Sequence, residues 1–360
     1  MKKVVSSAFC LFFLLTLVFW SAPENAAAAS KKQMIKLQQA YSKDLPVLGT
    51  GIQWWAEQVQ EASDGSLKIK IYEPGKLVKP FEILDAVSSG KLDAGFAFSG
   101  FWAGKLPAAP LFSAIPFGPE AAEYAAWMFR GNGMKLDQEM YDQAGYNVKV
   151  LPAVILPPET AGWFKEPINS LDDLKGKKMR FAGYGGKVMD KLGMATTVMP
   201  AGELFPALEK GVLDATEFSS PTIDKRLGFY KIAKYNYFPG WHQQATFIDI
   251  LINKDKWNKL SKSQQKLIEM SAYASVMNSI AEGEASQGSI IKENIEKRGV
   301  KTMYWSDEEL ATFKTLWEEV AGEEAKKYPF FKRAYADLKN FRAEYAYWQK
   351  LGFLPRKAAK

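Results

Sequence analysis

Short runs of alternating apolar and polar residues recur along the first part of the chain. In the clearest one, Leu67–Tyr72 reads L-K-I-K-I-Y and is followed by Pro74 and Gly75. Alternation with a period of two predicts a half-buried strand, and the proline and glycine predict the turn that ends it. An earlier strand is predicted over residues 36–41, followed by a helix over 50–62 that Gly65 closes.

Strands and helices are predicted to alternate through the rest of the chain. The first set is a helix over 81–87, a buried strand over 92–98, a helix over 120–141 and a strand over 146–155. The second set has strands over 178–181, 196–199 and 213–218, with helices over 186–192 and 203–210 between them. The last elements are a strand over 246–253, a helical tract over 263–298 and helices over 307–351.

Two sets of alternating elements predict an α/β protein with two lobes. The 360 residues exceed the usual size of one compact core, which also favours two lobes. A cleft between lobes is a common site for small ligands. The tract over 263–298 runs for more than 25 residues without a proline, so it is predicted to bridge the two lobes.

The N-terminus has the parts of a secretory signal peptide. Two lysines precede an apolar stretch over residues 8–20, and four alanines follow at 26–29. This stretch is shorter than the ~20 residues of a membrane span, so a cleavable signal peptide over 1–29 is favoured over a retained anchor. The sole cysteine, Cys10, lies in this segment, so the mature chain has no thiol. Export without disulfides suits the bacterial periplasm, and thiolate nucleophiles and thiolate metal sites are excluded.

Composition excludes several other classes of protein. With 47% hydrophobic and 24% charged residues, the chain is globular rather than disordered. Its net charge of +7 comes from dispersed lysines, so we expect no nucleic-acid partner. A single histidine, His242, leaves little material for zinc hydrolases or Ser-His-Asp triads. His242 could act as a base, but a partly buried imidazole hydrogen-bonded within a turn containing Trp241 is favoured.

Three charged residues are candidates for a binding site. Arg180 lies in an apolar strand, where its guanidinium needs an anion; a ligand carboxylate and a structural salt bridge to Asp172 or Asp173 are equally favoured. Glu217 lies where a strand ends, the edge that faces the crevice in open α/β sheets. It could pair with Arg180, bind a cation or face solvent. Glu159, after two prolines at the predicted crossing between lobes, is the third candidate.

Several segments together resemble one family of transport proteins. Residues 251–257, with Leu260, Ser261, Gln264 and Gln265, resemble the solute-binding proteins of tripartite ATP-independent periplasmic (TRAP) transporters. The same family is resembled, in matching order, by residues 175–180, 205–211 and 213–215. The resemblance covers nearly the whole mature chain. Within the family, one subgroup binds 2-oxo monocarboxylates such as pyruvate, or lactate. This subgroup is resembled by residues 161–164, 215–218, 227–235 and 237–241.

The resemblance implies a set of site residues. In that subgroup the strand arginine, here Arg180, holds the carboxylate of the acid, and a metal cation is shared between ligand and protein. The implied cation ligands here are Glu159, Glu217, the carbonyl of Phe218 and Gln243. The subgroup has glutamine where this chain has Glu159, and glutamate where it has Gln243. The number of carboxylates is unchanged, so an oxygen-rich site for Na⁺ or Ca²⁺ is expected to remain.

Aromatic residues of the first lobe are expected to cover the apolar end of the ligand. The candidates are Phe98 and Trp102, with Phe101 nearby, although core packing is the simpler explanation for any one of them. Ligand binding is then expected to favour a closed form that docks on the membrane permease.

The C-terminal segment carries an apolar stripe at helical spacing. Its members are Phe331, Tyr335, Leu338, Phe341, Tyr345 and Trp348. The stripe could pack on its own lobe, but a homodimer in which such helices embrace, as in relatives, is favoured.

The predicted fold class is α/β: a two-lobed periplasmic binding protein fold with an interlobe ligand cleft, a long bridging helix and extra C-terminal helices. Lobe I is predicted over 30–158 plus 243–285, lobe II over 159–242 plus 286–330, and a C-terminal helix over 331–360. The predicted function is the periplasmic binding component of a TRAP transporter for a small organic acid, with no catalytic cofactor and no enzymatic activity. The alternative is a periplasmic, metal-assisted enzyme acting on such an acid, with Glu159 or Glu217 as base.

Overall fold

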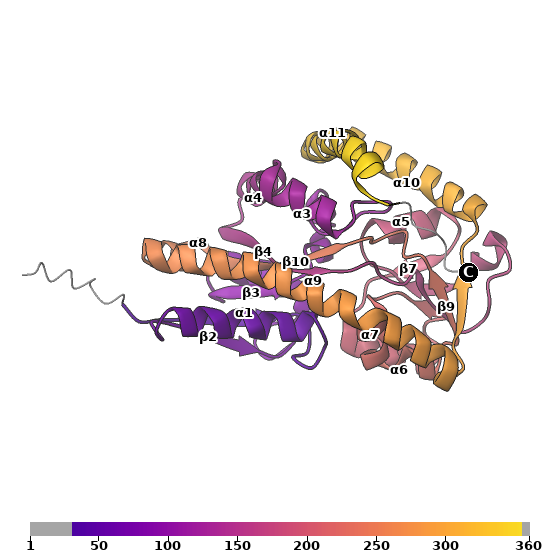
Figure 1. Ribbon diagram of the computed structural model, residues 1–360, viewed down its shortest axis with the longest axis horizontal. Coiled ribbons are helices and arrows are strands. Elements are labelled where there is room, and N and C mark those ends of the chain that lie inside the picture. The colour runs from indigo at the N-terminus through magenta and orange to yellow at the C-terminus, as the bar shows by residue number, and fades with distance from the viewer. Residues whose placement is uncertain (1–30, 355–360) are drawn as a thin grey trace, which may run out of the picture. The chain divides into compact units, whose positions relative to one another are not determined.

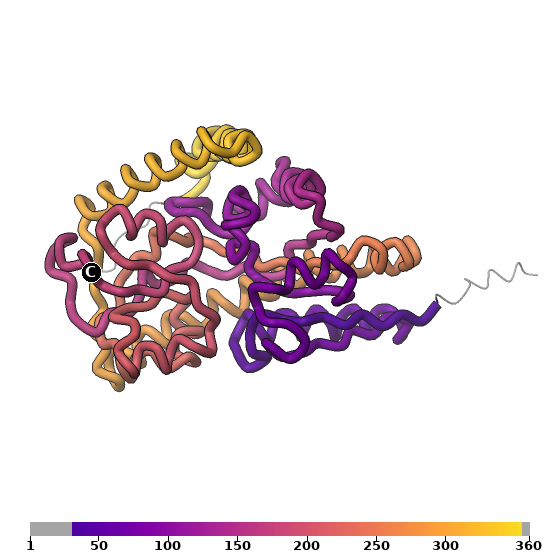
Figure 2. The backbone as a smooth tube through the Cα atoms, turned by 180° about the vertical axis from the view of Figure 1, so that it is seen from behind, coloured from indigo at the N-terminus to yellow at the C-terminus, as the bar shows by residue number. Residues whose placement is uncertain are grey.

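Two β-sheets organise the part of the chain that the computed structural model describes, residues 31–354 (Figure 1). The predicted signal peptide over 1–29 lies outside these residues. From Lys32 onward the chain forms one unit. Its two sheets define the two lobes, and the predicted α/β two-lobed fold is confirmed. In Figure 2, which shows the molecule from behind, most of the chain before residue 162 lies on one side. Most of the chain after it lies on the other side.

The sheet of lobe I has the strand order β2-β1-β3-β10-β4. β1, β2 and β3 are parallel, whereas β10 runs antiparallel between β3 and β4. β10 reads TFIDILIN and is buried along its whole length, as expected of a central strand covered on both faces. Its strands are β1 (Gln33–Gln39), β2 (Leu67–Tyr72), β3 (Ala94–Ala97), β4 (Val148–Leu156) and β10 (Thr246–Asn253).

The sheet of lobe II has the strand order β11-β9-β5-β8-β6-β7. β6 pairs in parallel with both β7 and β8, so the ends of β6 and β8 meet at one edge. That edge carries Arg180 and, one residue past β8, Glu217. Its strands are β5 (Gly162–Phe164), β6 (Lys178–Arg180), β7 (Ala195–Thr197), β8 (Ala215–Thr216), β9 (Tyr235–Phe238) and β11 (Lys301–Tyr304).

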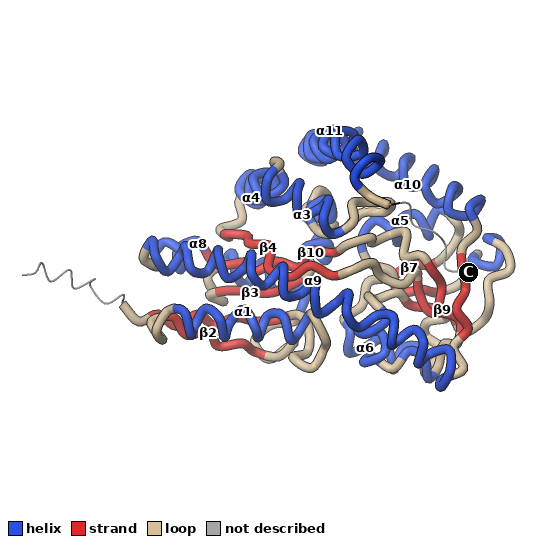
Figure 3. Tube along the Cα trace, viewed as in Figure 1, coloured by secondary structure: helices blue, strands red, loops and turns tan. Residues whose placement is uncertain are grey.

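Helices cover both sheets, and most match their predicted positions (Figure 3). The single helix predicted over 120–141 is wrong, because the chain forms two helices there. A Cβ on Gly131 would lie 2.7 Å from the Trp127 carbonyl oxygen, so the extended backbone that separates the two helices leaves room only for glycine there. The helices are α1 (Leu48–Ala62), α2 (Ile83–Ser88), α3 (Ala121–Arg130), α4 (Gly133–Gln143) and α8 (Lys254–Asn258) in lobe I, and α5 (Gly183–Lys191), α6 (Ala201–Glu209) and α7 (Pro221–Leu227) in lobe II.

The long bridging helix is confirmed as α9 (Lys262–Arg298), which is drawn in orange in Figure 1. Ser261 caps its first turn by accepting a hydrogen bond from the Gln264 N–H, and Gly299 ends it in the left-handed conformation. α9 packs on α1 and β4 of lobe I and on α7 of lobe II. One rigid helix therefore contacts both lobes.

A pair of C-terminal helices makes a second connection between the lobes. α10 (Asp307–Lys327) packs on α5 of lobe II, and α11 (Pro329–Gly352) packs on α3 and α4 of lobe I. Lys187 pairs with Glu324 at 2.7 Å on the first contact. On the second, the Trp127 indole N–H donates to Asp337 at 2.8 Å. None of the helices described between residues 31 and 354 combines the length and apolar character needed to cross a bilayer. The predicted lobe boundaries in sequence stay a prediction.

Two glycines of α9 allow a test of how closely this helix packs. A Cβ on Gly283 would lie 2.7 Å from Pro157 Cδ, whereas a Cβ on Gly288 would meet nothing within 4 Å. Gly283→Ala is expected to destabilise the protein by about 1–3 kcal/mol through overpacking. Gly288→Ala, the matched control, is expected to stabilise it by about 0.5–1 kcal/mol, because glycine weakens a helix interior. Urea unfolding measures both changes, and an equal gain from both substitutions would contradict the packing described.

Candidate functional site

A pocket of about 310 Å³, including the space at its mouth, lies between residues of the two lobes. Lobe I supplies a mostly apolar wall, and lobe II supplies Arg180, Ala182, Phe218 and Ser219. Glu159 and Gln243 come from the segments where the chain crosses between the sheets. The lobe I residues are Tyr41, Leu48, Phe98, Phe101, Leu156, Thr246 and Ile248. Its lining, polar on one side and apolar on the other, suits a small molecule with one polar and one apolar end.

Arg180 lies at the end of β6 with its side chain 3% exposed. Its Nη1 donates to Glu217 Oε1 at 2.7 Å and to the Glu217 carbonyl at 2.9 Å, and its Nε donates to the Met199 carbonyl at 3.3 Å. The guanidinium also lies over the Phe218 ring at 5.0 Å. Among the described residues Nη2 has no hydrogen-bond partner. Arg180 therefore has Glu217 as its anion within the protein, and its Nη2, which has no partner in the described part of the chain, is available to a ligand.

The structural partner of Arg180 is Glu217, not Asp172 or Asp173. Asp172 pairs with Lys175 at 2.7 Å, and Asp173 accepts hydrogen bonds from the Asn169 and Ser170 N–H groups. Both aspartates lie in the η4 turn (Leu171–Leu174), which precedes β6.

Glu217 is fully buried beneath the pocket rather than in its wall. Its Oε1 accepts hydrogen bonds from Arg180 and from the Ala182 N–H at 2.6 Å. Burial alone would raise the pKa of Glu217, but the charge of Arg180, with help from His242, holds that pKa below its usual value. Its other oxygen, Oε2, lies 3.6 Å from His242 Nε2.

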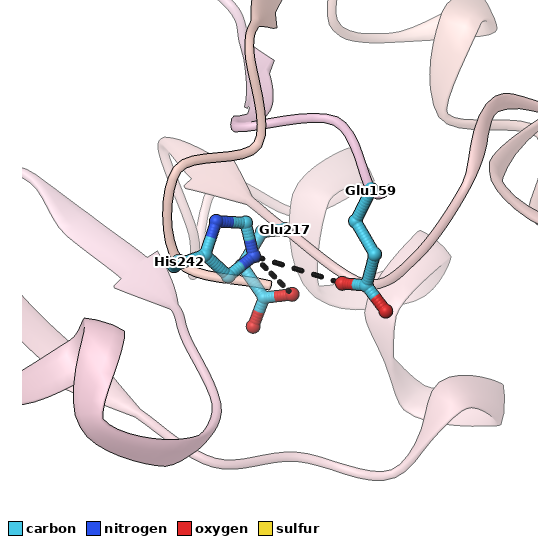
Figure 4. Close-up of side chains that lie close together, drawn as sticks. All are labelled: Glu159, Glu217 and His242. Carbon is cyan, nitrogen blue, oxygen red and sulfur yellow. Dashed lines mark ion pairs between the residues drawn. The ribbon is translucent and has the colours of Figure 1, made fainter. Parts of the chain in front are cut away.

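Glu159, Glu217 and His242 converge although their elements are far apart in the sequence (Figure 4). His242 Nε2 lies 3.6 Å from Oε2 of each glutamate, and one ligand atom from each residue lies within 4.8 Å of the others. Both glutamate Oε2 atoms and both imidazole nitrogens are buried without a hydrogen-bond partner among the described residues. Buried polar groups are costly when unpaired, so this cluster is built for a further proton or cation.

The charges of the cluster shift the affinities of its members for protons. Burial raises the pKa of Glu159 to about 7. Burial alone would lower the pKa of His242, but the two glutamates outweigh it and raise that pKa to about 9. The expectation that His242 is a partly buried imidazole hydrogen-bonded within a turn beside Trp241 is wrong. Its side chain is fully buried and faces two carboxylates that the sequence does not place near it.

Two crossing segments approach so closely that one position must be glycine. A Cβ on Gly240 would lie 2.1 Å from the Glu159 carbonyl oxygen. The Glu159 N–H donates to the Gln243 carbonyl at 3.2 Å. The Thr246 hydroxyl lies 2.7 Å from Gln243 Oε1 and 3.3 Å from Glu159 Oε1. These contacts bring the Glu159 and Gln243 side chains to the same side of the pocket.

The aromatic residues that line the pocket differ in part from those expected from the sequence. Phe98 and Phe101 line the pocket and meet edge to face at 5.4 Å. Trp102 does not line it; its indole N–H donates to the Tyr141 hydroxyl at 3.0 Å. Tyr41, which sequence analysis placed only at the end of a strand, lines the pocket and meets Phe218 of lobe II at 6.4 Å. No local pattern distinguishes Tyr41 from a core residue.

The residues present fit a hard cation. Glu159 and Glu217 each have an unpaired carboxylate oxygen, and Gln243 adds an amide oxygen at the pocket wall. Carboxylate and amide oxygens are the ligands that Na⁺ and Ca²⁺ prefer. Arg180, which lines the same pocket, is suited to a carboxylate. The residues present therefore have the chemistry to hold a small anion beside a cation.

This fold and site define an extracytoplasmic solute-binding protein. Residues 39–327 match the model of the DctP family, described as bacterial extracellular solute-binding protein, family 7, and the chain belongs to that family. The expected membership of the TRAP solute-binding proteins is confirmed.

Three relatives illustrate the similarity. A monocarboxylate 2-oxoacid-binding periplasmic protein of Nostoc sp. is 34% identical over 309 residues, covering 85% of this chain and 84% of the relative. A solved TRAP solute-binding protein of Bordetella bronchiseptica RB50, a mixed-occupancy dimer with copurified calcium and picolinate, has a TM-score of 0.86 at 28% identity, covering 89% of this chain and 95% of that one. Another from Pseudoalteromonas atlantica T6c, with sodium and pyruvate, has a TM-score of 0.85 at 31% identity, covering 89% and 97%.

The raised pKa of His242 predicts how stability depends on pH in the absence of acid and metal. A pKa of about 9 in the folded protein exceeds the value of about 6.5 in the unfolded chain. The resulting stabilisation is fully present below pH ~6.5 and is lost as the pH rises through ~9. It amounts to up to about 3 kcal/mol. Urea unfolding in chelator should therefore show the wild type losing more stability than His242→Gln over this interval; equal losses would contradict the assignment.

Proposed function

We propose that this chain is the periplasmic solute-binding component of a TRAP transporter, which captures a small 2-oxo or 2-hydroxy monocarboxylate with a metal cation. The observation that carries the proposal is the buried Arg180, which lines a small pocket together with Glu159 and Gln243. The Nostoc relative, described as binding 2-oxo monocarboxylates, supports the same class of ligand.

Charge balance explains why an acid and a cation would bind together. Glu159, Glu217 and the ligand carboxylate bring three negative charges, against two positive charges, those of Arg180 and of His242, whose pKa is raised to about 9. Buried charges must be compensated, because desolvation otherwise exceeds the attraction between them. A bound Na⁺ or Ca²⁺ would supply the missing positive charge. The cation would be held by Glu159, Glu217, Gln243 and the Phe218 carbonyl. Arg180 would orient the acid.

The two ends of the ligand would meet different lobes. Its carboxylate would contact Arg180 of lobe II, while Phe98, Phe101 and Tyr41 of lobe I would cover its apolar end. A ligand that contacts both lobes favours the closed arrangement of a two-lobed protein. In the proposed function this closed form delivers the acid to the membrane permease. The signal peptide predicted over 1–29 would direct the chain to the periplasm, where relatives of the family are found.

Binding rather than turnover is the activity that the family supports, because its members are solute-binding proteins. The alternative, a metal-assisted enzyme using Glu159 or Glu217 as base, makes a different prediction. Incubation with 2-oxo and 2-hydroxy acids and Ca²⁺ would then yield a new product, which chromatography would detect. We expect the acids to be recovered unchanged.

Titration calorimetry with pyruvate and lactate, on protein refolded free of ligand, tests the proposed function. The wild type is expected to bind at least one such acid in Ca²⁺ or Na⁺, and to lose that binding in chelator with a bulky organic cation as the only salt. Arg180→Lys is expected to weaken binding by about 30-fold or more, because a lysine cannot keep the forked contacts to Glu217 and to a carboxylate.

Arg226→Lys, at a mostly exposed arginine of α7, is the matched control and should bind as the wild type does. Binding of no small acid under any of these conditions would contradict the proposed ligand class. Binding that survives removal of every metal cation would contradict the role of the cation.

We also propose that the end of α11 joins two copies of the chain. The first part of the predicted apolar stripe packs on the protein itself, since Phe331 and Leu338 are fully buried. Beyond it, large apolar side chains of the helix end are exposed, which is unusual for a solvated surface. The B. bronchiseptica relative is described as a dimer. The exposed residues are Tyr347 (76%), Trp348 (59%), Leu351 (82%), Phe353 (54%) and Leu354 (92%).

Light scattering across a concentration series checks this arrangement. The wild type is expected to be a dimer, and the double substitution Trp348→Glu with Leu351→Glu is expected to weaken dimerisation at least 10-fold, because it places charges in an apolar contact. Val212→Glu, at an exposed valine of lobe II, should leave the dimer intact. A monomeric wild type at high concentration would rule the dimer out.

A further inference from the structure

Asp224 of α7 is a fully buried carboxylate that lies outside the pocket wall. Its Oδ2 accepts hydrogen bonds from the Trp163 indole N–H at 2.8 Å and from the Thr160 hydroxyl at 3.2 Å. Its Oδ1 accepts one from the Ser219 N–H at 3.1 Å. Among the described residues it forms no ion pair, so neutral donors alone compensate the carboxylate.

Two of these three donors adjoin the candidate site. Thr160 follows Glu159 on the first crossing between the lobes, and Ser219 follows Phe218 in the loop after β8. The Thr160 N–H also donates to the Ser219 carbonyl at 3.1 Å. Asp224 thus holds together the two segments that carry Glu159 on one side and Glu217 with Phe218 on the other.

We propose that Asp224 is a positioning residue for the site: its carboxylate fixes the spacing between the Glu159 segment and the Glu217–Phe218 segment, and so sets the affinity for the acid and its cation. The inference rests on the proposed function. A residue that orients the ligands of a cation is held to narrow limits, because small shifts of the ligand oxygens change the affinity strongly.

The position of Asp224 is itself set by the long helix α9. Its neighbour Thr222 on α7 makes three contacts with α9. The Thr222 N–H donates to Gln287 Oε1 at 3.0 Å, and its hydroxyl lies 3.2 Å from the same oxygen and 2.8 Å from the Ser286 hydroxyl. Lys225 pairs with Glu293 of α9 at 2.9 Å. The contacts run from the helix that spans both lobes, through α7 and Asp224, to the pocket.

A carboxylate suits this place better than an amide does. Asp224 receives donors on both oxygens, whereas an asparagine has one acceptor oxygen and an NH₂ that would face a donor. Burial raises the pKa of Asp224 well above its usual range, so this position is costly for a charged group. Asp224→Asn keeps the shape and removes this pattern of acceptors.

The test measures pyruvate affinity by calorimetry at a series of Ca²⁺ concentrations. Asp224→Asn is expected to weaken binding by about 10–100-fold and to require more Ca²⁺ for half-maximal binding, as found for residues that orient metal ligands. Thr160→Val, which removes only the donor beside Glu159, should show a smaller shift in the same direction. Thr160→Ser retains the hydroxyl and should bind as the wild type does.

Two further variants separate positioning from general stability. Trp163→Phe removes a donor to Asp224 that does not adjoin the pocket, and Asp137→Asn alters another fully buried carboxylate, on α4 of lobe I. Both are expected to change the melting temperature without altering the Ca²⁺ dependence of pyruvate binding. Proportional losses of affinity and stability across Asp224→Asn, Thr160→Val, Trp163→Phe and Asp137→Asn would mean that Asp224 has a structural role only, and the proposal would be wrong.

The remaining outcomes are also decisive. A folded Asp224→Asn protein with wild-type affinity and Ca²⁺ dependence would overturn the proposal. If Asp224→Asn does not fold, a Thr160→Val protein with wild-type binding would overturn it instead. A wild type that binds no small acid would contradict the proposed function alone. The positioning role would then be judged from a crystal structure of Asp224→Asn, in which an unchanged Thr160–Ser219 contact would rule it out.

Discussion

The buried ion pair of Arg180 and Glu217 is the interaction on which the site depends. Both side chains are almost completely buried and lie 2.7 Å apart, so each charge lost its hydration and must be compensated by the other. The pair uses one Nη of the arginine and one carboxylate oxygen of the glutamate. The other glutamate oxygen faces His242 and lies near Glu159. A structural pair thereby joins the arginine of the pocket to the cluster of Glu159, Glu217 and His242.

The surrounding fold brings these groups together by crossing between two sheets. The parallel pairing of β6 with β8 places Arg180 and Glu217 at one edge. The two crossings at Glu159 and at Gly240 approach within contact distance, because glycine leaves room for the Glu159 carbonyl. The polar side of the pocket therefore comes from four separate segments. A displacement of any one of them would change the spacing of all the charges.

Membership of the DctP family gives this arrangement its biological context. The relatives of known structure share the fold over most of their length, and those from B. bronchiseptica and P. atlantica are described with an acid beside calcium or sodium. In this chain α9 and the α10–α11 pair both contact the two lobes, on separate surfaces. The two lobes are therefore joined by packed helices as well as by the crossing segments.

Elements that depend on local order can be predicted from the sequence. The alternation over Leu67–Tyr72, the uninterrupted tract that became α9, and the α/β class all follow from periodicity and from glycine and proline positions. Arg180, Glu217 and Glu159 could be singled out because a charge inside or at the end of an apolar strand, or at a crossing, is conspicuous locally. The separation of α3 from α4 was missed, although Gly131 and Gly133 signal it.

Contacts between distant residues, by contrast, depend on how the elements pack in three dimensions. His242 lies 83 residues from Glu159 in sequence, and no local pattern reveals that its imidazole faces two carboxylates. Local patterns likewise do not reveal the position of Tyr41 in the pocket wall, the contacts of Asp224, or the orientation of Trp102 away from the pocket. Periodicity reports which face of an element is buried. It does not report which other element covers that face, because this depends on the packing of segments that are far apart in the chain.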